Sequence, residues 1–306
     1  MTEDIVQCPE GEGKSFRSGY ASIIGRPNVG KSTLLNAVLG EKVAIVTPKP
    51  QTTRNRIIGI KTLPEFQIIF IDTPGIHKPK HKLGEIMVRT AVQSLEGIDV
   101  VLFMTEPVMP KIQDRLIISL LKKVTVPVFL IINKIDTVKK EELLPVMECF
   151  RNLFPFTGLL PVSALKHDGI ALLVKEIAKH LPYGPRYYPE DIVTDQIERF
   201  MVMELIREKI IQMTKEEIPH SAAVEIIDWK EREDGLVSIH SNIYIERESQ
   251  KGIIIGKKGA MLKAISTAAR HDIERLLNAK VFIQLWVKIR KGWRENGTIL
   301  KELGYQ

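Results

Sequence analysis

The most constraining feature of this 306-residue chain is an eight-residue loop, Gly25-Arg-Pro-Asn-Val-Gly-Lys-Ser32, set between two apolar segments. A short apolar run at 20–25 leads into the loop, and residues 31–40 follow it with the spacing of a helix. A glycine-containing loop between a strand and a helix presents backbone amides and the positive end of the helix to phosphate groups. This part of the chain is therefore expected to fold as a phosphate-binding strand–loop–helix unit.

Short apolar runs alternate with helical patterns as far as residue 182. The runs are bounded by turn residues, which is typical of a mostly parallel sheet covered by helices on both faces. We therefore predict an α/β domain over residues 18–182. Its further strands are expected near 56–62, 66–72, 99–104, 127–133 and 158–163, and its further helices near 83–96, 112–123, 140–152 and 169–181.

Two motifs are suited to a nucleotide triphosphate and its metal ion. Lys31 is expected to reach the β- and γ-phosphates, and Ser32 to ligate Mg²⁺. Asp72-Thr-Pro-Gly75 ends the next predicted strand, where Asp72 can hold Mg²⁺ and the Gly75 amide can approach the γ-phosphate. The nucleotide-binding residues predicted here are Gly25, Arg26, Pro27, Asn28, Val29, Gly30, Lys31, Ser32, Thr33, Asp72, Thr73, Pro74, Gly75 and Ile76.

Two further motifs are suited to a guanine base. The Asp136 carboxylate can accept from guanine N1–H and the exocyclic amine together, and adenine has no such donor pair. Asn133 can fasten its loop to the phosphate-binding loop, the stem of Lys134 can cover the base, and the Ala164 amide can donate to guanine O6. All of these motifs follow predicted strands, as ligand sites in open α/β sheets do. The predicted base-binding residues are Asn133, Lys134, Ile135, Asp136, Ser163 and Ala164.

A second domain is predicted beyond a linker. The linker is assigned to residues 183–196 because of the proline-rich stretch at 181–191. The pattern that follows predicts a helix from residue 197, a hairpin, a glycine-rich turn, a helix and a strand. The hairpin strands are expected at 222–229 and 236–247, the later helix at 260–277 and the last strand at 280–290.

The glycine-rich turn of this domain, Gly256-Lys-Lys-Gly259, suggests an RNA-binding surface. Two glycines with lysines between them are the device by which KH domains clamp about four nucleotides of single-stranded RNA. Residues 251–294 carry eleven basic and two acidic side chains, which is typical of a polyanion-binding face. The order α-β-β-α-α-β predicts an α+β type II KH domain over 197–306, ending in a C-terminal helix. Trp286, in mid-strand, is expected in the core. The candidate RNA-binding residues are Lys251, Gly256, Lys257, Lys258, Gly259, Lys263, Arg290 and Lys291.

The motif order and the second domain make residues 18–295 resemble the Era subgroup of translation-factor-related GTPases. The loop Pro50-Gln-Thr-Thr-Arg54 contributes to this resemblance. The resemblance implies binding and hydrolysis of GTP to GDP, with a switch I threonine that closes over Mg²⁺. Thr53 is our choice for that threonine, with Thr52 as the alternative. The predicted catalytic residues are Lys31, Thr53, Asp72 and Gly75, and the predicted Mg²⁺ ligands are Ser32, Thr53 and Asp72.

The same resemblance implies the partners. They are the 3′ region of small-subunit ribosomal RNA and the small ribosomal subunit, whose assembly the protein would assist; DNA is not expected as a partner. Nucleotide state would regulate access of the second domain to RNA. Weak association with the inner face of the cell membrane is a secondary expectation.

One position departs from the best-known GTPases. They carry a water-positioning glutamine directly after the glycine of the strand-end motif, and here Ile76 occupies that position. We therefore expect slow hydrolysis that depends on the switch backbone, Mg²⁺ or a monovalent cation. Asn28 matches the asparagine that several relatives use as a K⁺ ligand, so K⁺ is a further candidate cofactor.

The composition restricts the other possibilities. No window approaches 18 consecutive apolar residues, the start of the chain lacks a signal-peptide pattern, and the two cysteines, Cys8 and Cys149, form no metal-type pair. We therefore expect a cytoplasmic protein with a flexible extension at 1–17. Two rival functions fit the sequence less well. A tRNA-modification GTPase would carry other appended domains and a C-terminal cysteine, and a pure RNA-binding module would not need the intact set of Lys31, Ser32 and Asp72.

Overall fold

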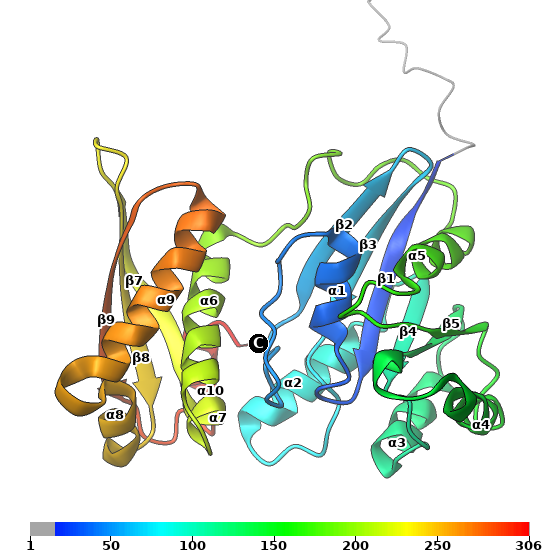
Figure 1. Cartoon of the computed structure of the whole chain (residues 1–306), viewed down its shortest axis with the longest axis horizontal. Helices are drawn as coiled ribbons and strands as arrows, with labels where there is room; N and C mark the ends of the chain where they lie inside the picture. Colours follow the sequence, from blue (N-terminus) through cyan, green and yellow to red (C-terminus); the bar gives the residue numbers. More distant parts are fainter. Residues whose placement is uncertain (1–15, 306) are drawn as a thin grey trace, which may run out of the picture.

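The computed structural model describes residues 16–305, which form two domains joined by a linker (Figure 1). The predicted extension at 1–17, with Cys8, lies outside the described residues except for its last two positions. Arg17 already belongs to the first strand, β1 (Arg17–Gly25). The fold class predicted for both domains, a P-loop α/β domain followed by a type II KH domain, is confirmed.

The first domain is built on a six-stranded sheet in the order β2-β3-β1-β4-β5-β6. Every neighbouring pair is parallel except β2 and β3, which form an antiparallel hairpin. The remaining strands are β2 (Ile57–Leu63), β3 (Phe66–Asp72), β4 (Val100–Thr105), β5 (Val128–Ile132) and β6 (Gly158–Pro161). The helices are α1 (Lys31–Leu39), α2 (Lys82–Gln93), α3 (Ile112–Leu121), α4 (Lys140–Arg151) and α5 (Ile170–Lys179), with a 3-10 turn η1 (Ile135–Thr137).

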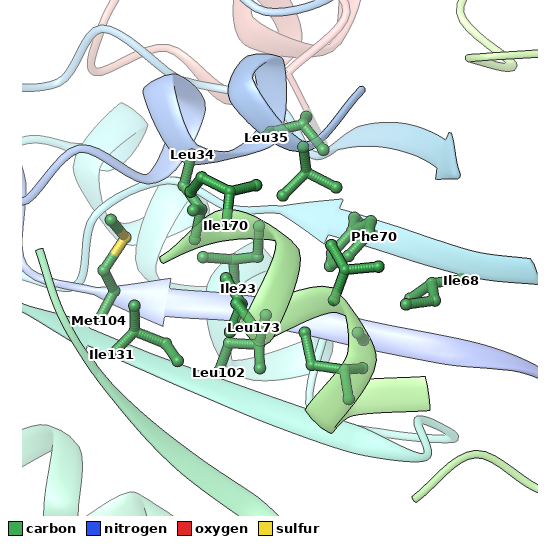
Figure 2. Close-up of a cluster of buried hydrophobic side chains, with 14 of the residues drawn as sticks. Ile23, Leu34, Leu35, Ile68, Phe70, Leu102, Met104, Ile131, Ile170 and Leu173 are labelled. Atoms are coloured by element: carbon green, nitrogen blue, oxygen red, sulfur yellow. The ribbon is translucent and has the colours of Figure 1, made fainter. Parts of the chain in front are cut away.

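The central strands are apolar almost throughout because helices cover both faces of the sheet. Helices α1 and α5 pack on one face, where Leu34 and Leu173 meet Ile23 and Leu102 of the strands (Figure 2). Helices α2, α3 and α4 pack on the other face, around Phe103. This packing fixes the carboxyl ends of β1, β3, β4 and β5 side by side, which is where the predicted nucleotide motifs lie.

The linker runs along the β2–β3 side of this sheet. The Gln67 amide oxygen accepts from the backbone N–H groups of Tyr187 and Tyr188, and its nitrogen donates to the Tyr188 carbonyl. The Ile60 amide donates to the Val193 carbonyl. These bonds fasten the connection to the first domain before the second domain begins.

The second domain contains a three-stranded sheet in the order β7-β8-β9, with β7 and β8 antiparallel and β8 and β9 parallel. Its strands are β7 (Ala223–Glu231), β8 (Val237–Ile245) and β9 (Val281–Ile289), and its helices are α6 (Glu198–Met213), α7 (Ile218–Ser221), α8 (Glu248–Ile255), α9 (Ala260–Leu277) and α10 (Gly297–Glu302), with the 3-10 turn η2 (Lys257–Gly259). Helix α8, directly before Gly256, is the first of the two consecutive helices in the predicted order α-β-β-α-α-β.

The core of the second domain lies between its sheet and the helices α6 and α9. Ile206 and Ile210 of α6 and Ile265 of α9 are completely buried there against Ile239 and Ile243 of β8. The expectation for Trp286 is wrong, because its side chain is 39% exposed. Trp293, in the segment after β9, is the fully buried tryptophan instead.

Candidate functional site

The phosphate-binding loop connects β1 to α1 with the strained geometry that its glycines permit. Gly30 has a φ of 99°, and a Cβ built on it would lie 2.3 Å from the Asn133 side-chain nitrogen. A larger residue at this position would therefore push Asn133 away or open the loop. Lys31, almost fully buried, donates from Nζ to the carbonyls of Gly25 and Arg26 at 3.4 and 3.0 Å.

Three oxygen-bearing side chains converge beside this loop. The Ser32 hydroxyl lies 2.8 Å from the Thr53 hydroxyl and donates to Asp72 Oδ2 at 2.6 Å. Asp72 is completely buried, and its other carboxylate oxygen has no hydrogen-bond partner in the structure. A buried carboxylate oxygen with no partner is costly unless a cation or donor meets it. The arrangement therefore fits a hard divalent cation with oxygen ligands.

Burial dominates the electrostatics of this cluster. Burial raises the pKa of the Asp72 carboxyl to about 6, although the Lys31 ammonium and the Ser32 hydroxyl pull it down. Burial likewise lowers the pKa of Lys31 to about 8, against the attraction of Asp72. Both groups are thus held in a poorly solvated place, where a charged ligand interacts strongly with them.

The predicted base-binding motifs lie together at the ends of β5 and β6. Asn133 donates from its side-chain nitrogen to the Val29 carbonyl at 2.9 Å and so ties this loop to the phosphate-binding loop. Ser163 donates to the Asp136 carboxylate at 2.5 Å. The Ala164 amide donates to the Asn133 side-chain oxygen at 2.9 Å, and its donation to guanine O6 stays a prediction.

The residue after Gly75, Ile76, offers no polar side chain to the phosphate site. Ile76 is buried in the core beside α2, and its backbone N–H donates to the Gly25 carbonyl at 3.0 Å. Gly75 packs so closely on the phosphate-binding loop that an added Cβ would lie 2.5 Å from the Pro27 nitrogen. His77, the next residue, contacts the Gly75 carbonyl and the Gln51 side chain.

A cavity of about 420 Å³ lies beside the phosphate-binding loop, and Asp72, Asn133, Asp136, Ser163 and Ala164 are not among its lining residues. Its lining includes the predicted residues Pro27, Asn28, Gly30, Lys31, Ser32, Thr33, Thr53, Gly75 and Lys134, and also Thr52. Residues 45–54 form the loop that we call the switch I loop. Asn28 donates to the Pro48 carbonyl at 3.0 Å, which brings this loop against the phosphate-binding loop. Arg26 is not among the lining residues, and its side chain pairs with Asp114 at 2.8 Å and with Glu106 at 3.4 Å.

Sequence reasoning missed several residues of this cavity. Ile45, Val46, Thr47, Pro48 and Gln51 come from the switch I loop, in which only Thr52 and Thr53 were predicted as ligands. Glu106 follows the end of β4 and accepts from Lys134 at 2.7 Å. Burial would raise the pKa of Glu106, but the hydrogen bond and charge of Lys134 and the charge of Arg26 bring it below its ordinary value. The same strand-end rule that found Asp72 could have found Glu106.

The second domain forms hydrogen bonds with the switch I loop on both sides of Thr53, at Lys49 and Thr52 before it and at Arg54 after it. Arg207 of α6, itself paired with Glu204, donates to the Thr52 carbonyl. Lys49 donates to the carbonyls of Ile211 and Thr214, at the end of α6.

Arg54 makes the most extensive of these contacts. Its side chain is 2% exposed and donates to the carbonyls of Pro219, His220 and Ala222 at 3.2, 3.1 and 2.8 Å. Its guanidinium carbon lies 5.7 and 5.9 Å from the ring centres of Trp293 and Tyr305. The residue directly after Thr53 is therefore inserted into the second domain.

The segment after Asp72 also meets the second domain. His81 lies 2.8 Å from Glu295, and the Leu83 amide donates to the Arg294 carbonyl at 3.0 Å. Leu83 and Met87 of α2 pack in one cluster with residues of the C-terminal segment, Trp293, Leu300, Leu303 and Tyr305. Both the switch I loop and the segment after Asp72 thus contact the second domain.

The predicted RNA-binding residues gather mainly around η2. Lys257, Lys258 and Lys263 are exposed, and Lys258 has a φ of 52° in the tight turn. Lys251 is half-buried on α8 and Lys291 is exposed after β9. Arg290 is half-buried, pairs with Glu302 and lies over the Tyr244 ring at 5.5 Å. Its role toward RNA stays a prediction, and the exposed lysines are the candidates with the most open access to phosphate.

The fold and the site define the class as a P-loop GTPase domain joined to a KH domain. A model of the family described as 50S ribosome-binding GTPase matches residues 20–134, and a KH-domain model matches residues 217–294. Within residues 16–305, no helix is long and apolar enough to cross a membrane.

The chain belongs to the Era family of GTPases, so the resemblance read from its motifs is confirmed. It is 51% identical to GTPase Era of Ruminiclostridium cellulolyticum, covering 95% of this chain and 98% of the relative. It is 54% identical to GTPase Era of Geotalea uraniireducens, covering 96% and 99%. A crystal structure of Era with MgGDPNP and nucleotides 1506–1542 of 16S ribosomal RNA matches at a TM-score of 0.92 and 43% identity, covering 95% of this chain and 99% of that one. An Aquifex aeolicus Era variant bound to GDP and AlF4⁻ matches with the same values.

Proposed function

We propose that this protein binds GTP, hydrolyses it to GDP and phosphate, and binds the 3′ region of small-subunit ribosomal RNA through its KH domain. In doing so it would assist assembly of the small ribosomal subunit. The observation that carries the proposal is the convergence of Ser32, Thr53 and Asp72 beside the phosphate-binding loop, in a chain that also presents Lys257 and Lys258 on a KH turn. The ligands of the matching Era structure, MgGDPNP and 16S ribosomal RNA, support both halves.

The phosphate groups are assigned to the loop amides and to Lys31. On binding nucleotide, the Lys31 ammonium would exchange its two carbonyl contacts for β- and γ-phosphate oxygens. Mg²⁺ would be held by Ser32, Thr53 and Asp72, and it would supply charge neutralisation on the phosphates. Thr53 is preferred over Thr52 because its hydroxyl is the one that contacts Ser32, whereas the Thr52 hydroxyl lies against Thr47.

Guanine selection is assigned to Asp136. Its carboxylate already accepts one donor, the Ser163 hydroxyl, and retains capacity for the N1–H and amine of guanine. Lys134 is fixed by Asn28 and Glu106 at 2.7 Å each, so its alkyl stem is held at the loop where the base would lie.

Hydrolysis is expected to be slow, because the buried Ile76 cannot position water. The Gly75 amide and the Thr53 backbone remain to orient the γ-phosphate and the attacking water. We assign K⁺, held in part by Asn28, as a second cation that would add positive charge near the phosphates. Hydrolysis measured in KCl should exceed hydrolysis in NaCl at equal ionic strength, and equal rates would reject the K⁺ assignment.

The nucleotide state is proposed to control RNA access through the switch I loop. That loop is connected to the KH domain through Lys49, Thr52 and Arg54. Loss of the γ-phosphate would remove the contact that holds Thr53, and the loop would then be released from the second domain. Equal RNA affinity with GDP and with a non-hydrolysable GTP analogue would count against this coupling.

The cellular setting follows from these partners. We place the protein in the cytoplasm, with weak association at the inner membrane face as a secondary property that vesicle flotation can test. The main experiment is crosslinking in cells, with K257D/K258D as the control. The wild type should crosslink to small-subunit ribosomal RNA and the control should not. If wild-type crosslinks lack that RNA, the RNA half of the proposal is wrong, whereas GTP turnover, with Lys31→Ala as its control, tests the enzymatic half separately.

A further inference from the structure

The KH sheet has one face that its helices do not cover. Helices α6 and α9 pack on the inner face, and the C-terminal segment covers part of the outer face, where Trp293 and Leu300 pack with Ala223 and Tyr244. Strand β9 lies at the edge of the sheet, on the side of the domain away from the GTPase domain (Figure 1). Part of the outer face along β9 therefore remains open to solvent.

Aromatic rings occupy this open part. Phe282 and Trp286 of β9 are 46% and 39% exposed. The ring of His240, on the neighbouring strand β8, lies 5.4 Å from Trp286 and 6.3 Å from Phe282, edge-on to both. Because His240 pairs in register with Gln284, it sits between the two larger rings. We call Phe282, Trp286 and His240 the aromatic face.

Positive charge borders the aromatic face. Side chains two residues apart on a strand point to the same side of the sheet, so Phe282, Gln284, Trp286 and Lys288 of β9 form one row. Lys280 directly precedes the strand, and both lysines are exposed. On the far strand, Lys230 pairs at 3.1 Å with Asp228, which lies 3.8 Å from His240. A lysine thus lies at or before each end of the row, and Asp228 is already paired with Lys230.

We infer that the aromatic face is a second RNA-binding surface, on which bases of single-stranded RNA stack while the flanking lysines hold the phosphates. Exposed aromatic side chains within a basic surface form stacking platforms that accept any base. A protein-docking face is disfavoured because lysine is depleted at such interfaces. The surface is separate from the GKKG turn, since Lys257 and Lys258 follow α8 and the aromatic face lies across the sheet from α9. The inference rests on the proposed RNA-binding function and extends it to a longer stretch of RNA.

The test compares two substitutions of one residue in the full chain. Trp286→Leu keeps an apolar side chain but removes the ring, and Trp286→Phe keeps a ring. The probe is the RNA that the related Era binds, nucleotides 1506–1542 of 16S ribosomal RNA, in a fluorescence anisotropy titration with GTP analogue present. Loss of one stacked base should weaken binding about tenfold for Trp286→Leu, whereas Trp286→Phe should stay close to wild type. Lys288→Glu, a variant that keeps all three rings of the aromatic face, should also weaken RNA binding.

The outcomes separate this inference from the proposed function. If K257D/K258D abolishes binding and Trp286→Leu leaves the affinity unchanged, the KH function stands and the second surface is rejected. A face that docks a protein would give that same result. If neither variant changes affinity, the RNA-binding function itself fails. Thermal unfolding of each variant controls for folding, and photocrosslinks from the RNA to Phe282 or Trp286 in the wild type would support the inference directly.

Discussion

Replacing Arg54 by alanine tests how the second domain contributes to the nucleotide site. Arg54 follows Thr53 directly and is buried against three backbone carbonyls and two aromatic rings of the second domain. Burial lowers the pKa of Arg54, but an arginine side chain remains charged in a protein. A charged hydrogen bond contributes about 1.5–3 kcal/mol, and the desolvation of the guanidinium offsets part of the three made here.

A net loss of about 3 kcal/mol is a reasonable value for this contact, and it corresponds to a fall of about 150-fold in the ratio of docked to undocked switch loop. In this docked arrangement the Thr53 hydroxyl lies beside Ser32, and we expect that contact to be lost when the loop undocks. Apparent affinity for Mg²⁺ and GTP analogue should therefore fall in proportion to the lost docked fraction. GDP affinity should change much less, because the proposed contacts of its phosphates are with the loop at Gly30 and Lys31 and not with Thr53.

The assay is GTP hydrolysis as a function of Mg²⁺ concentration, with analogue and GDP affinities measured in parallel. Arg56→Ala is the matched control, since Arg56 lies two residues further along the same loop and its side chain is exposed. We expect Arg54→Ala to need more Mg²⁺ and to turn over more slowly, and Arg56→Ala to behave as wild type. If the Arg54 and Arg56 variants have the same Mg²⁺ dependence, the second domain does not hold Thr53 in place and the reasoning is refuted.

Three further predictions follow from single contacts. Asp136→Asn should weaken GDP binding by about 100-fold, since two hydrogen bonds to a carboxylate are lost. Calorimetry should show that the variant has a lower affinity than wild type for guanosine diphosphate and a higher affinity for xanthosine diphosphate. Trp293→Ala should cost about 3–5 kcal/mol of stability, because a fully buried tryptophan that donates to Ser221 is removed; an unchanged urea midpoint would contradict this. K257A/K258A should lower the salt-dependence slope of RNA binding by about 1.4, which titrations at several KCl concentrations can measure.

The nucleotide motifs could be predicted from the sequence because each is local. A glycine loop after a strand, or an aspartate at a strand end, has the same chemistry wherever the strands meet, and a parallel sheet brings those ends together. Lys31, Asp72 and Asn133 are therefore found where their motifs indicated. Their roles toward nucleotide stay predictions until the assays above are done.

The interface between the domains could not be predicted in the same way. Arg54 contacts carbonyls 165 to 168 residues further along the chain, and an arginine in a Pro/Thr-rich loop has the sequence character of an exposed residue. The prediction that Trp286 is buried was wrong for another reason. Strand β9 has large apolar residues on both faces, so alternation alone does not tell which face is buried.

Thermodynamic linkage sets what the domain contact can do. The factor by which docking of the switch I loop raises GTP affinity must equal the factor by which bound GTP favours docking. Thr53 and Arg54 couple the two equilibria because they are adjacent in the chain. The exposed lysines of the GKKG turn lie outside the contact that Arg54 makes. RNA bound there would influence hydrolysis only if it bound the docked and undocked arrangements with different affinity. The Arg54→Ala variant distinguishes these cases, since it weakens docking without touching the RNA surface. If RNA stimulates hydrolysis in the wild type by favouring docking, saturating RNA should partly restore hydrolysis in the variant.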